Sequence, residues 1–135
     1  MSTKSRPNVD GDKTIAIIGL GARLPGAMSV KTFWENVQQK VYAIRETPRD
    51  RWDPELFWDP DPEAPDKTYS KIGGWITDFE FNRKRYRIPP MVIQNMDPTQ
   101  TMCLETVHEA LEDSGYLERD FDRERCAVIL GNAMG

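Results

Sequence analysis

Apolar residues form two short continuous runs, one near each end of the chain. The first is TIAIIGLG, residues 14–21, and the second is CAVILG, residues 126–131. Both are aliphatic without alternating polar positions, a pattern typical of strands that are buried on both faces of a parallel sheet. The sequence therefore predicts two parallel strands as the frame of the fold.

Between these runs, two stretches carry apolar residues at helical spacing. The first begins at Ser29, which is a suitable N-cap. Its apolar positions are Val30, Phe33, Trp34 and Val37. The second begins at Asp97, another suitable N-cap, with Pro98 at the first helical position, Gln100 where a capping box has Glu or Gln, and Gly115 as the C-terminal stop.

The second predicted helix, residues 98–114, contains the only histidine and one of two cysteines. Its apolar face consists of Cys103, Val107, Ala110, Leu111 and Ser114. His108 falls on the polar face together with Glu105, Glu109 and Glu112. Because positions five apart on a helix point in different directions, Cys103 and His108 do not form a thiol–imidazole pair. The pattern predicts a core cysteine and a solvated histidine.

The segment between the helices is irregular. Residues 48–65 contain five prolines among tryptophans and charges, which predicts a non-helical insertion fixed by its aromatic side chains. Residues 67–76, KTYSKIGGWI, predict a short strand or a hairpin around Gly73 and Gly74. The order strand, helix, insertion, helix, strand predicts an α/β fold with a mostly parallel sheet and a right-handed crossover.

Composition limits the functional classes. A chain of 135 residues is one ordinary domain, and a net charge of −4 argues against general attraction to nucleic acid or an anionic membrane. Residues 1–12 are expected to form a flexible polar tail before a domain at 13–135, with neither a signal-peptide core nor a membrane span. Cys103 and Cys126 predict two buried reduced thiols in a cytoplasmic protein.

Three short motifs suggest ligands, and each has a simpler interpretation. GLGARL, residues 19–24, begins like a dinucleotide fingerprint but has Leu24 at the third glycine position and Pro25 where the helix should run. Asp59, Asp61 and Glu63 resemble half of a calcium loop, but glycine and glutamate are missing from its sixth and twelfth positions. Neither a nucleotide nor a metal site is predicted.

The third motif is RKRYR, residues 83–87. It places Arg83, Lys84, Arg85 and Arg87 around Tyr86. A solvated loop is the simpler interpretation, and a docking patch for an acidic partner is the functional one. From the residues alone, the chain is a soluble α/β domain without a visible catalytic apparatus.

Several phrases together resemble the opening part of a β-ketoacyl synthase. They are IAIIGLGARLPGA, FWENV, AIRETPRDRWDPELFWDPDP, KTYSKIGGWI, MDPTQTMCLETVHEALEDSGY and CAVILGNAMG, in this order over residues 13–135. They are similar to condensing domains of modular polyketide synthases and of polyunsaturated fatty acid synthases. The double proline of YRIPPMVIQNMDPTQ resembles the polyunsaturated fatty acid branch or a related iterative synthase.

This resemblance implies a partial thiolase-like fold and an acyltransferase. The family's fold has two similar α/β halves, and its enzymes are usually homodimers. Its reaction is a decarboxylative Claisen condensation in polyketide or fatty acid biosynthesis, in which a cysteine takes the acyl group and two histidines support decarboxylation of a malonyl thioester. The partner is an acyl carrier protein with its phosphopantetheine arm, and neither a metal nor a nucleotide is implied.

The family's catalytic residues have no counterpart in this sequence. Its nucleophile lies in a Thr-Ala-Cys-Ser phrase beyond the strand that corresponds to residues 126–131, and its histidines lie further on. Neither Cys103 nor Cys126 matches that phrase, and His108 matches neither histidine. The segment alone is therefore expected to be inactive and marginally folded. The alternative is a non-catalytic scaffold whose RKRYR patch binds a carrier protein or a partner subunit.

Overall fold

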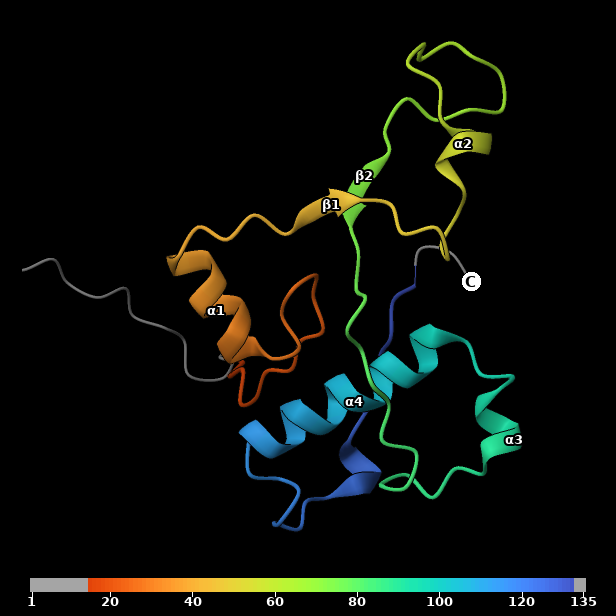
Figure 1. Ribbon diagram of the computed structural model, residues 1–135. Coiled ribbons are helices and arrows are strands. Elements are labelled where there is room, and N and C mark those ends of the chain that lie inside the picture. Colours follow the sequence, from red (N-terminus) through yellow and green to blue (C-terminus); the bar gives the residue numbers. More distant parts are fainter. Residues whose placement is uncertain (1–14, 133–135) are drawn as a thin grey trace, which may run out of the picture.

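The computed structural model describes residues 15–132, and helices are its main regular elements (Figure 1). In chain order, the elements are α1 (Val30–Gln38), β1 (Ile44–Glu46), α2 (Pro54–Phe57), β2 (Ile72–Gly74), α3 (Pro90–Ile93), α4 (Pro98–Asp113) and a 3₁₀ turn at Arg123–Arg125. The predicted polar tail, residues 1–12, lies outside the described range.

Both predicted helices are confirmed, and their ends follow from local capping. The Ser29 hydroxyl accepts a hydrogen bond from the Thr32 backbone N–H at 3.1 Å, which starts α1. The Asp97 carboxylate accepts one from the Thr99 N–H at 2.7 Å, which starts α4. Gly115 adopts a φ of 73° after α4, a left-handed conformation that glycine reaches without steric cost.

The cap of α4 makes the first turn of this helix sensitive to acid. Hydrogen bonds from the hydroxyl and the backbone N–H of Thr99 lower the pKa of Asp97. The ionised Asp97 carboxylate is therefore favoured in the folded chain. Its contribution to stability is fully present above the unfolded-state pKa, and it is lost as the pH falls through the lower folded-state pKa. In Asp97→Asn, whose amide oxygen still caps the helix, we expect the exchange protection of the Thr99 amide to become independent of acid pH. Equal acid loss of protection in both proteins would contradict this assignment.

The predicted parallel sheet is not confirmed. In the described part of the chain, neither apolar run forms a strand or pairs with one, and Ile15 and Ile129 are 93% and 91% exposed. Within residues 15–132, the sheet consists of β1 and β2, which pair antiparallel with Arg45 opposite Gly73. A strand forms only where a neighbouring backbone supplies matching donors and acceptors, and each run lies without such a neighbour.

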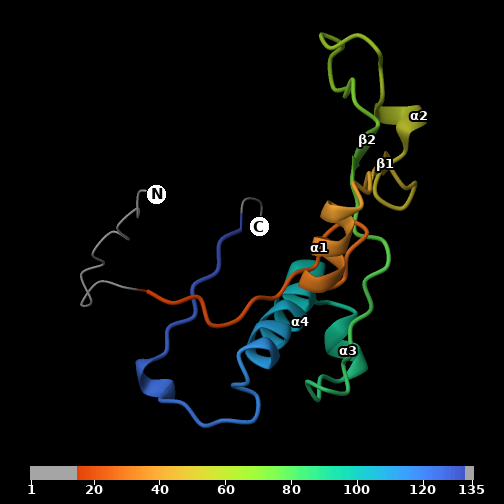
Figure 2. The ribbon, with the colours of Figure 1, turned by 90° about the vertical axis from the view of Figure 1, so that its left-hand side faces the viewer.

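The middle of the chain forms a lobe that projects away from the long helices (Figures 1 and 2). Its proline-rich part is largely irregular, as predicted, but it contains the short helix α2, where the prediction was non-helical. The Trp58 indole N–H donates to the Tyr69 carbonyl at 3.1 Å, and Lys71 lies over the Trp58 ring. Gly73 and Gly74 belong to a strand, as predicted, but their partner is β1 rather than a hairpin within residues 67–76.

Little apolar surface is buried. Ala27 is the only hydrophobic residue in the buried class among residues 15–132. Cys103 is half-buried, and Cys126 is exposed, so the prediction of two buried thiols is wrong for Cys126, which begins an unpaired apolar run. Across the part of the chain that the structure describes, none of the helices is long and apolar enough to cross a membrane.

The exposure of these apolar side chains predicts that residues 1–135 on their own unfold with poor cooperativity. We expect a broad thermal transition, binding of the dye ANS and self-association, because large apolar side chains remain in water. Circular dichroism during heating, with sedimentation at several concentrations, measures both properties. A monomer with a sharp melt would refute this expectation.

Candidate functional site

The principal polar site is a row of three carboxylates along α4. Glu105, Glu109 and Asp113 follow one another at four-residue intervals and therefore share one face of the helix. Each accepts hydrogen bonds from backbone N–H groups of distant segments. We call Glu105, Glu109 and Asp113 the carboxylate row.

Glu105 is the most buried member of the row, at 5% exposure. One carboxylate oxygen accepts from the Asn82 N–H at 3.1 Å, and the other accepts from an Arg85 guanidinium nitrogen at 2.8 Å. The guanidinium of Arg23 lies 4.0 Å from the second oxygen and also donates to the Glu105 carbonyl at 3.3 Å. Charge-assisted hydrogen bonds on both oxygens compensate for the loss of water around the carboxylate.

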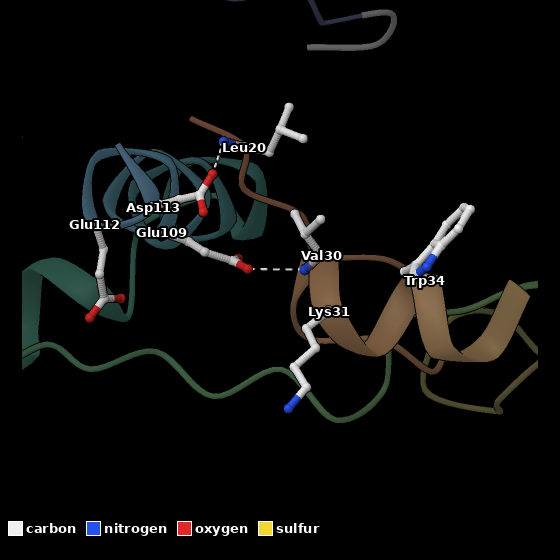
Figure 3. Close-up of a pocket in the computed structure, with 7 residues that line it drawn as sticks. All are labelled: Leu20, Val30, Lys31, Trp34, Glu109, Glu112 and Asp113. Carbon is white, nitrogen blue, oxygen red and sulfur yellow. Dashed lines mark hydrogen bonds between the residues drawn. The ribbon is translucent and has the colours of Figure 1, made fainter. Parts of the chain in front are cut away.

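Glu109 and Asp113 join the N-terminal segment to α4 (Figure 3). Glu109 accepts from the backbone N–H of Val30 at 3.0 Å and from that of Ala22 at 3.2 Å, and it forms an ion pair with Arg23. Val30 is the first residue of α1, where backbone N–H groups lack helical partners and the helix dipole favours an anion. Asp113 accepts from the Leu20 N–H at 2.9 Å.

Gly19 and Gly21 allow this segment to touch the helix backbone. A Cβ atom on Gly19 would lie 2.2 Å from the Ala110 carbonyl oxygen, and one on Gly21 would lie 2.1 Å from that of Thr106. The two glycines of the GLGARL motif therefore serve helix packing. The N–H groups of Leu20 and Ala22 already bind carboxylates, which gives this loop the wrong electrostatics for a phosphate.

Cys103 and His108 lie against different neighbours. Cys103 lines a mainly apolar cavity of about 720 Å³, as its position on the apolar face predicts. The His108 ring meets the Tyr86 ring edge-on, with 6.2 Å between their centroids. His108 is half-buried, so the prediction of a solvated histidine is wrong, because Tyr86 from a distant turn covers it.

The four cations of RKRYR are all exposed, but they differ in their partners. Arg85 forms an ion pair with the buried Glu105, whereas Arg83, Lys84 and Arg87 form no ion pair within residues 15–132. The Tyr86 hydroxyl donates a hydrogen bond to the Leu104 carbonyl at 3.1 Å, and the Tyr86 ring stacks on Phe81. Burial raises the pKa of Tyr86, so its hydroxyl keeps the proton that it donates.

The calcium-like acidic stretch forms local turns. Asp59 and Asp61 each accept the backbone N–H of the residue two positions later. Over residues 15–132, no group of three or more His, Cys, Asp or Glu side chains is arranged to hold a metal ion.

The sequence interpretation missed the carboxylate row and its arginine. It placed Glu105 and Glu109 on the polar face of the helix, and it gave Arg23 no role. The four-residue spacing of the carboxylates was a visible signal, because it places all three on one face. The row and Arg23 hold three segments against α4, namely residues 20–23, the first residue of α1 and residues 82–85, so the contacts of this site are structural.

Comparisons with known proteins agree with the resemblance. Residues 12–135 match the family described as "Beta-ketoacyl synthase, N-terminal domain". Polyketide synthase PksL of Bacillus subtilis is 39% identical over 87% of this chain, which spans 3% of that protein. A polyunsaturated fatty acid synthase of Thraustochytrium is 30% identical over 97% of this chain, which spans 5% of that protein.

A solved structure shows the same arrangement. The oxazolomycin ketosynthase domain of Streptomyces albus superposes with a TM-score of 0.66 and 39% identity, over 72% of this chain and 17% of that one. The chain thus spans only a small part of the relatives and of the solved domain that it matches. It belongs to the β-ketoacyl synthase family and represents part of that family's N-terminal domain.

Proposed function

We propose that this chain is the N-terminal scaffold of a condensing enzyme in polyketide or fatty acid biosynthesis. The enzyme would join an acyl thioester to a malonyl unit carried by an acyl carrier protein. The family match over residues 12–135 carries this proposal. Relatives named as polyketide and as polyunsaturated fatty acid synthases support both product classes.

The proposed reaction needs residues beyond those present here. A cysteine thiolate attacks the acyl thioester and takes the acyl group, and the thiol that carried the acyl group leaves. The malonyl unit then loses CO₂ to give an enolate. The enolate carbon attacks the acyl thioester, a carbon–carbon bond forms, and the thiolate leaves. Residues 15–132 would contribute rigidity through α4 and the carboxylate row. The complete enzyme would be a cytoplasmic homodimer.

Two exposed apolar runs support the proposal that this chain is a scaffold for a larger sheet. Residues 15–18 and 128–130 are aliphatic and exposed, and they lack strand partners within the part of the chain that the structure describes. An unpaired, aliphatic strand edge is a site for pairing with further strands. In the proposed enzyme, the two runs would become inner strands of a larger sheet.

The test begins with the protein from its native source. Intact mass and peptide mapping should give a mass far above that of residues 1–135 and a peptide with a Thr-Ala-Cys-Ser phrase. Incubation with an acyl-pantetheine thioester should then add the acyl mass to that cysteine and leave Cys103 and Cys126 unmodified. A native mass equal to that of residues 1–135 would refute the proposal.

A non-catalytic docking module is the second candidate. The outward cations Arg83, Lys84 and Arg87 favour it, because they make no ion pair among residues 15–132. For this function we expect carrier-protein binding that weakens with salt, without transfer of an acyl group to any cysteine.

A further inference from the structure

We draw no further inference here: the strongest candidate, the cavity of about 490 Å³ between α1 and the C-terminal turns of α4, which Lys31, Trp34 and Glu112 line, is also walled by Leu20 of the first apolar run, and nothing in the structure shows what covers it.

Discussion

Replacing Glu105 by alanine should cost about 3 kcal/mol of the stability that holds α4 to its neighbours. The substitution leaves the Asn82 N–H without its acceptor and Arg23 without one of two nearby carboxylates. Removing one partner of a buried ion pair costs about 3–5 kcal/mol. The lower figure applies because the Arg85 side chain is 40% exposed, so water screens that part of the interaction.

Native-state hydrogen exchange of α4 amides in the full-length chain measures this effect, because it reports the free energy of local opening. Glu112→Ala is the matched control, since Glu112 is an exposed carboxylate on the same helix. Its effect should stay within about 0.5 kcal/mol. Similar values for both variants would show that the Glu105 carboxylate does not hold α4.

Replacing Gly21 by alanine should separate the N-terminal segment from α4. The new Cβ would lie 2.1 Å from the Thr106 carbonyl oxygen and 3.0 Å from the Ala110 backbone nitrogen. Both atoms belong to a helix backbone that cannot rotate away as a side chain does. Overpacking of this kind costs about 1–3 kcal/mol, and we expect the upper end.

The control for this substitution is Gly131→Ala, because a Cβ at Gly131 meets no atom within 4 Å. The same exchange measurement on residues 106–110 should show faster opening in Gly21→Ala and no change in Gly131→Ala. Equal protection in the two variants would mean that the segment lies further from α4 than the structure shows.

Capping residues were predictable because their chemistry is local. Ser29 and Asp97 each bond to an N–H two or three residues later, and Gly115 ends α4 through its own backbone conformation. Such interactions need only the neighbouring sequence. The boundaries of α1 and α4 follow from them.

The carboxylate row was not predictable by the same reasoning. A glutamate on the polar face of a helix is normally solvated, and the sequence shows no donor near Glu105 or Glu109. Their donors are Asn82, Ala22 and Val30, which approach only in the folded chain. Burial of a carboxylate depends on such distant partners.

The amino-acid sequence by itself determined the two longer helices, α1 and α4, the largely irregular proline-rich insertion and the family, because these depend on local bonding and on the order of short phrases. Tertiary structure alone decided which groups meet. It paired Arg85 with the buried Glu105, and it set Gly21 against α4. It also left residues 15–18 and 128–130 unpaired. The physical reason is that a strand, unlike a helix, obtains its hydrogen bonds from another segment of chain.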